Sequence, residues 1–251
     1  MDRNQLAPAG GPTADGATPD ASQLAASSAR TRRDFLRAAG AASGAALMLA
    51  ACSDDPSRIV APTAVTPAIV NGNNITLDFA LDTDVVNYAF ALEQLEAAFY
   101  TRVVADPAFT TTFPSASEQT ILRDLRDHEV IHRDFLAAVL GNARIPNLTP
   151  IFSTINFANR LSVLQTAQTF EDLGVGAYNG AGRYFKDAAF LTVAGKIVSV
   201  EARHAAAIRA VLNGNRSQAF APTPFDEALP PAQVLAAAGP FIAQNITVIN
   251  A

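Results

Sequence analysis

Two short motifs contain the residues whose types and spacing are typical of metal chemistry. Residues 129–132 (EVIH) and residues 201–204 (EARH) both read Glu-x-x-His. In a helix, side chains three positions apart lie on the same face, so each motif presents one carboxylate and one imidazole together. Both glutamates fall in the middle of an apolar helical stripe, where an uncompensated charge is strongly unfavourable. A cation bound between the two motifs would offset that penalty.

Two further glutamates belong to an internal repeat. Residues 92–100 (LEQLEAAFY) align without gaps with residues 170–178 (FEDLGVGAY), so that Glu93 matches Glu171. Each half of the chain therefore reads Glu-x6-Tyr, followed on the next helix by Glu-x-x-His. An oxygen-rich site that also contains two imidazoles suits iron or manganese better than copper or structural zinc.

The repeat also bears on the neighbouring side chains. Glu93 and Glu96 could both face inward, but Glu96 aligns with Gly174, so we expect Glu93 to be the ligand and keep Glu96 as the alternative. Tyr100 and Tyr178 each lie two helical turns after their glutamate, where a hydroxyl could donate to a liganding carboxylate and hold it in place. The alternative is that both are ordinary core tyrosines with their hydroxyls at the rim.

Four helical segments must position these residues. Helical periodicity, capping residues and helix-ending prolines and glycines predict helices at about 83–104, 115–140, 157–184 and 188–212. The first and second helices are joined by a short link, as are the third and fourth, whereas a longer connector follows the second helix. This order predicts an all-α, antiparallel four-helix bundle with one long crossover between helices 2 and 3.

One Glu from each of two helices and Glu-x-x-His from each of the other two resembles the ferritin-like di-iron carboxylate proteins. The resemblance covers roughly residues 80–214, and it implies two metal ions, iron or manganese, with Glu129 and Glu201 as the bridging pair. The implied ligands are Glu93, Glu129, His132, Glu171, Glu201 and His204. The sequence of residues 92–100, together with the export signal described below, resembles that of bacterial exported ferritin-like proteins linked to desiccation and stress.

Two other interpretations compete with this one. Residues 128–132 (HEVIH) match the His-Glu-x-x-His signature of zinc proteases, in which His128 and His132 would bind zinc and Glu129 would activate water. However, Val200 stands at the position equivalent to His128, so the zinc signature is not what repeats. A metal-free bundle is the second alternative, but four carboxylates placed together without a cation repel one another.

The N-terminal region has the features of an export signal. Residues 31–52 resemble a twin-arginine signal peptide, with Arg32 and Arg33 ahead of a short apolar stretch that ends in a lipobox at Cys52. The alternatives are an N-terminal membrane helix and a buried Ala-rich helix. The signal predicts a protein that is exported across the cytoplasmic membrane and anchored to a lipid membrane through acylated Cys52, in the periplasm or cell envelope.

The remaining regions are poor in apolar periodicity. We predict a disordered extension at 1–30, a flexible tether at 53–79, and a Pro-rich tail at 215–251 with one short helix near 232–238. A net charge of −5 argues against nucleic acid as a partner, and a single cysteine excludes an internal disulfide.

The resemblance implies a function at the metal site. It implies oxidation of Fe(II) or reduction of peroxide in envelope stress protection, with O2 or peroxide as the small-molecule partner. The alternative is a non-catalytic metal-binding or structural stress module. We expect a monomer or dimer rather than a storage cage, because a lipid anchor and long tails would crowd a closed shell.

Overall fold

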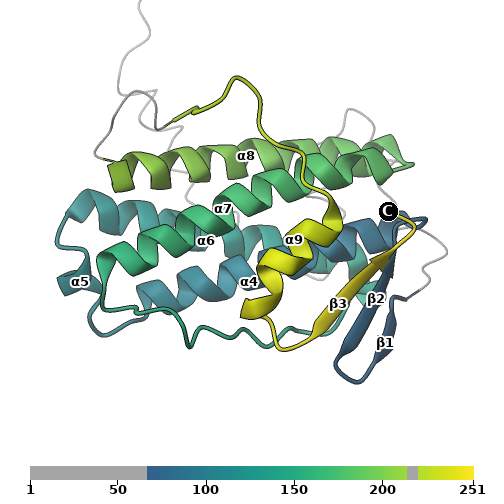
Figure 1. Cartoon of the computed structure of the whole chain (residues 1–251), viewed down its shortest axis with the longest axis horizontal. Coiled ribbons are helices and arrows are strands. Elements are labelled where there is room, and N and C mark those ends of the chain that lie inside the picture. Colours follow the sequence, from purple (N-terminus) through teal and green to yellow (C-terminus); the bar gives the residue numbers. More distant parts are fainter. Residues whose placement is uncertain (1–66, 214–219) are drawn as a thin grey trace, which may run out of the picture. The chain divides into compact units, whose positions relative to one another are not determined.

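The computed structural model describes residues 67–213 and 220–251 of the chain. The predicted disordered extension, the signal peptide with Arg32, Arg33 and Cys52, and most of the tether lie outside these residues. The four long helices are α4 (Asp82–Val104), α6 (Ala116–Leu140), α7 (Arg160–Ala181) and α8 (Ala188–Asn213). They run side by side, with α4 packed on α6 and α7 packed on α8 (Figure 1).

The connections between these helices follow the predicted order. A short helix, α5 (Phe109–Thr112), lies in the link between α4 and α6, and a brief turn joins α7 to α8. Residues 141–159 form the longer crossover from α6 to α7. The all-α, antiparallel four-helix bundle with one crossover between its second and third helices is therefore confirmed.

Local capping explains where the central helices begin and end. The Ser115 hydroxyl accepts a hydrogen bond from the backbone N–H three residues later and opens α6, and Gly141, with a φ of 53°, follows its last residue. The helix predicted at 157–184 is shorter in the structure. The Asn159 side chain accepts a hydrogen bond from the Ser162 N–H at 3.0 Å and caps α7, which therefore begins at Arg160.

A small three-stranded sheet was not predicted. Its strands are β1 (Ile69–Asn71), β2 (Asn74–Asp78) and β3 (Asn245–Ile249), in the order β1-β2-β3, with β1 antiparallel and β3 parallel to β2. Residues 69–78 thus differ from the predicted tether, which extended to residue 79. Ile75 and Leu77 are 1% and 0% exposed, because alternate residues of β2 point into the core beside α4.

The C-terminal segment packs closely on the bundle. Helix α9 (Pro231–Ala238), near the predicted short helix, lies against α7 and leads into β3 (Figure 1). Just before α9, the Leu229 N–H donates to the Gly176 carbonyl at 2.9 Å, and a Cβ on Gly180 would lie 1.8 Å from the Leu229 oxygen. Glycine at position 180 is therefore what allows this segment to approach α7. No helix in the described ranges is both long and apolar enough to cross a bilayer.

Candidate metal centre

Six side chains from the four long helices meet in the centre of the bundle. Glu93 comes from α4, Glu129 and His132 from α6, Glu171 from α7, and Glu201 and His204 from α8. All four glutamates are 0% exposed, and the side chains of His132 and His204 are 13% and 4% exposed. The structure therefore brings together all six residues that the sequence predicted as ligands, whereas their role as ligands stays a prediction.

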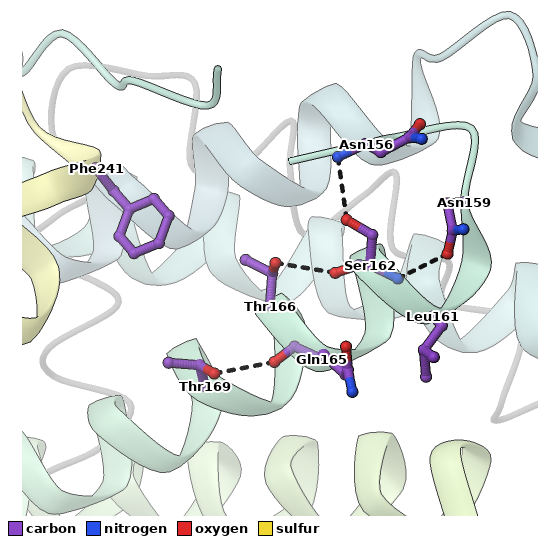
Figure 2. A pocket seen from close by; sticks show the side chains of 8 residues that line it. All are labelled: Asn156, Asn159, Leu161, Ser162, Gln165, Thr166, Thr169 and Phe241. Carbon is purple, nitrogen blue, oxygen red and sulfur yellow. Dashed lines mark hydrogen bonds between the residues drawn. The ribbon is translucent and has the colours of Figure 1, made fainter. Parts of the chain in front are cut away.

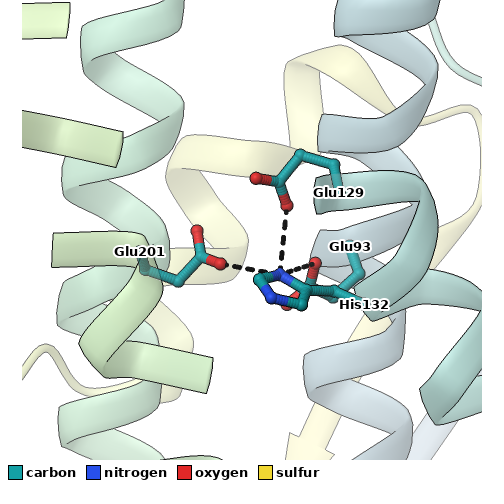
Figure 3. A group of neighbouring side chains, drawn as sticks. All are labelled: Glu93, Glu129, His132 and Glu201. Atoms are coloured by element: carbon teal, nitrogen blue, oxygen red, sulfur yellow. Dashed lines mark ion pairs between the residues drawn. The ribbon is translucent and has the colours of Figure 1, made fainter. Parts of the chain in front are cut away.

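The six residues form two overlapping groups. Figure 3 shows Glu93, Glu129, His132 and Glu201 converging from three helices, with ligand atoms that all lie within 4.8 Å of one another. The second group, which meets the same criterion, is Glu129, Glu171, Glu201 and His204. Glu129 and Glu201 belong to both groups, as expected for carboxylates that could bridge two ions.

The distances repeat from one half to the other. In the first half, His132 Nδ1 lies 2.9 Å from Glu201 Oε1, 3.5 Å from Glu93 Oε2 and 3.6 Å from Glu129 Oε2. The second half replaces each residue by its repeat partner. His204 Nδ1 lies 2.7 Å from Glu129, 3.5 Å from Glu171 and 3.7 Å from Glu201. The internal sequence repeat is thus an approximate twofold symmetry of the site.

These atoms fit a cation better than they fit one another. The two imidazole Nδ1 atoms, both oxygens of Glu129 and Glu201, and the Oε2 atoms of Glu93 and Glu171 are buried, and none of them makes a hydrogen bond within the described part of the chain. Native proteins rarely leave buried polar atoms in this state. The atoms are close to each other but are not aligned as donors and acceptors, because they face a common centre.

Two tyrosines hold the outer carboxylates. The Tyr178 hydroxyl donates to Glu93 Oε1 at 2.6 Å, and the Tyr100 hydroxyl donates to Glu171 Oε1 at 2.5 Å. The hydrogen bonds expected from the sequence are present, but each tyrosine bonds the glutamate of the other half rather than that of its own helix. Each bond occupies one carboxylate oxygen and leaves Oε2 turned towards the site.

Glu96 lies beside the site but in neither group. Its side chain is 3% exposed, and a Cβ on Gly174 would lie 3.0 Å from Glu96 Oε1 and 3.7 Å from Glu201 Oε2. The missing side chain at Gly174, its partner in the repeat, therefore leaves room for the Glu96 carboxylate. Burial raises the pKa of Glu96 well above its usual value, and the charges of Glu201 and the other site glutamates add to this effect.

His128 does not take the place of a zinc ligand. Its Nδ1 lies 2.9 Å from His204 Nε2, and the two ring planes are nearly parallel, at an interplanar angle of 13°. His128 is exposed and belongs to neither group of ligand atoms. The sequence offered no repeated signal for this contact, because Val200 stands at the equivalent position.

The electrostatics show how much the cluster depends on compensating charge. Burial raises the pKa of Glu129 well above its usual value and that of Glu171 to about 7. Burial lowers the pKa of His204, but the surrounding carboxylates outweigh it and raise the value to about 12. For Glu201 the two histidines outweigh burial and lower the pKa to about 2. Without a cation, the cluster therefore retains protons that a divalent ion would displace.

A surface groove of about 410 Å³ lies elsewhere, along the first half of α7 (Figure 2). It is lined by neutral polar side chains and Leu161, with the Phe241 ring at one end. The Thr166 and Thr169 hydroxyls donate to carbonyls of the helix itself. None of the six clustered residues lines this groove.

The fold and the site together define a class of protein: a helical bundle whose core holds a glutamate and histidine cluster suited to metal ions. Residues 81–214, more than half of the chain, match the ferritin-like domain family. The chain therefore belongs to that family, as the resemblance in the sequence predicted. No protein of curated function matches the sequence.

Proposed function

We propose that the cluster binds two metal ions, iron or manganese, one in each group of ligands, with Glu129 and Glu201 bridging them. The observation that supports this proposal is the convergence of eight buried nitrogen and oxygen atoms that lack hydrogen bonds. Charge supports it as well, because two divalent cations balance four carboxylates when both imidazoles are neutral. The donor set of carboxylates with two imidazoles suits iron or manganese.

We further propose that the protein oxidises Fe(II) or reduces peroxide. Iron at this site would supply the electron-transfer chemistry with O2 or peroxide. The protein would contribute rigid positioning, with Tyr100 and Tyr178 fixing the orientation of the outer carboxylates. Of the six proposed ligands, His132 is the most exposed, so small reactants would approach from its side.

Metal content and oxygen uptake test both parts of the proposal. The full chain, purified gently, should contain two metal ions per chain, and anaerobic Fe(II) followed by O2 or peroxide should give stoichiometric iron oxidation. Glu201→Gln should abolish metal binding and iron oxidation, whereas the exposed control Glu227→Gln should leave metal binding and iron oxidation unchanged. Bound iron without any consumption of O2 or peroxide would leave a non-catalytic metal-binding module. A wild-type chain that binds no metal would refute the proposal.

The setting of this activity is proposed from the sequence alone. Arg32, Arg33 and Cys52 support export by the twin-arginine route, lipid anchoring at the cell envelope and a role in stress protection there. A bundle that acquires its metal before export suits a route that carries folded proteins. Cys52→Ala should move the protein from the membrane fraction to the soluble fraction, and a variant that stays membrane-bound would contradict the anchor.

A further inference from the structure

The two halves of the metal centre differ in what lies behind their histidines. His204 Nε2 is 2.9 Å from His128 Nδ1, and the centroids of these nearly parallel rings are 5.1 Å apart. The equivalent position in the other half is Val200, whose side chain cannot form a hydrogen bond. The ligand side chains differ in exposure too, at 4% for His204 and 13% for His132.

The contact with His128 gives His204 an acceptor for its Nε2–H whenever Nδ1 is a ligand. A neutral imidazole that binds metal through Nδ1 carries its proton on Nε2, and that N–H then points at His128 Nδ1. A hydrogen bond of this kind fixes the orientation of the ring and raises its basicity towards the metal. His128 therefore supports one half of a site whose ligands are otherwise duplicated.

We propose that His128 is a positioning residue that makes the two metal sites unequal. The ion held by Glu171 and His204 binds first and more tightly, and the ion held by Glu93 and His132 binds second and exchanges with solvent. This inference rests on the proposed binding of two ions. It gives the centre one retained ion and one exchangeable ion, as expected if Fe(II) enters and leaves on the more exposed side.

A titration of the metal-free full chain with Mn(II), followed by the EPR signal of free Mn(II), tests this. The wild type should bind two ions in two steps whose dissociation constants differ by roughly 10- to 100-fold, the usual effect of a hydrogen bond behind a metal ligand. His128→Val, which copies the other half, should weaken the first step by that factor and leave the second unchanged. His132→Ala should retain the tight step, and His204→Ala should lose it.

A variant that keeps an acceptor separates the hydrogen bond from the bulk of the ring. His128→Gln, whose amide oxygen can accept a hydrogen bond from His204 Nε2, should retain most of the wild-type difference between the two dissociation constants. Equal losses in His128→Gln and His128→Val would overturn the inference, as would two wild-type steps of equal strength. A wild-type chain that binds no Mn(II) and no Fe(II) would instead refute the proposed function itself.

Discussion

Replacing Glu171 by glutamine should stabilise the metal-free protein. The Glu171 carboxylate is 0% exposed, its Oε1 accepts a hydrogen bond from Tyr100, and its Oε2 has no hydrogen bond in the described chain. Burial raises the pKa of this group from 4.5 to about 7, so the folded protein resists its ionisation. Glutamine keeps an oxygen that can accept from Tyr100 but never ionises.

The size of the effect follows from that change in pKa. Because the folded-state pKa of Glu171 is raised, the folded chain binds more protons than the unfolded chain between pH 4.5 and about 7. Stability is therefore lost as the pH rises through this window. At about 1.4 kcal/mol per tenfold change in proton affinity, the penalty is about 3 kcal/mol at pH 8 and under about 1 kcal/mol at pH 5.

Denaturant unfolding of the metal-free chain at these two pH values measures the effect. Glu171→Gln should raise the free energy of unfolding by about 3 kcal/mol at pH 8 and by much less at pH 5. Glu227→Gln, at an exposed position, should change it little at either pH. A variant that is less stable than wild type at pH 8, or that gains equally at both values, would refute the electrostatic reasoning.

Added metal should narrow this difference in stability. A ligand that binds only the folded state at 100 times its dissociation constant stabilises a protein by about 2.7 kcal/mol. The wild type should gain this amount from Mn(II) or Fe(II), whereas Glu171→Gln, which lacks one proposed ligand, should gain less at the same concentration. The same unfolding experiment measures both gains. A larger gain for the wild type indicates that the Glu171 carboxylate serves metal binding rather than folding.

Three further predictions follow from the same contacts. Metal binding should release protons from the site carboxylates and histidines, so that the affinity for metal rises between pH 6 and 8. Calorimetry in two buffers of different ionisation enthalpy measures the number of protons released. Tyr178→Phe removes the hydrogen bond to Glu93 and should weaken metal binding roughly 10- to 100-fold with little change in helix content, as measured by titration and circular dichroism. Gly180→Ala places a Cβ against the Leu229 carbonyl and should lower the melting temperature of the metal-free chain, since the backbone must move. Gly195→Ala, where a Cβ would have nothing within 4 Å, should instead raise the free energy of unfolding by about 1 kcal/mol, the difference in helix propensity between the two residues. A stabilised Gly180→Ala would contradict the close packing of the C-terminal segment.

The cluster of glutamates and histidines could be predicted because its signal is local and occurs twice. Glu-x-x-His places two donors on one helix face without reference to the rest of the fold, and the second copy shows which residues belong to it. The same comparison separated Glu93 from Glu96, and the structure shows why: Gly174 leaves the space that the Glu96 carboxylate fills. Burial of Glu129 and Glu201 follows from their position on the apolar stripes of their helices.

The sheet and the tyrosine partners could not be predicted in the same way. β2 pairs in parallel with β3, and Thr76 lies opposite Thr247, so the partner strand is distant in sequence and short. No turn joins β2 to β3, and neither strand belongs to the internal repeat. The tyrosine alignment predicted donors but not their partners, because the sequence does not show that α4 and α7 face each other across the site.

The residues that differ between the two halves make the surroundings of the site unequal. A duplicated site would bind two equivalent ions if every neighbour were duplicated, yet His128 faces His204 whereas its counterpart is Val200, and Glu96 has only Gly174 opposite it. Both departures lie outside the six clustered residues and change what surrounds them. A chemistry that retains one ion while exchanging another requires such unequal surroundings, so differences between the halves are where the function of this centre should be sought.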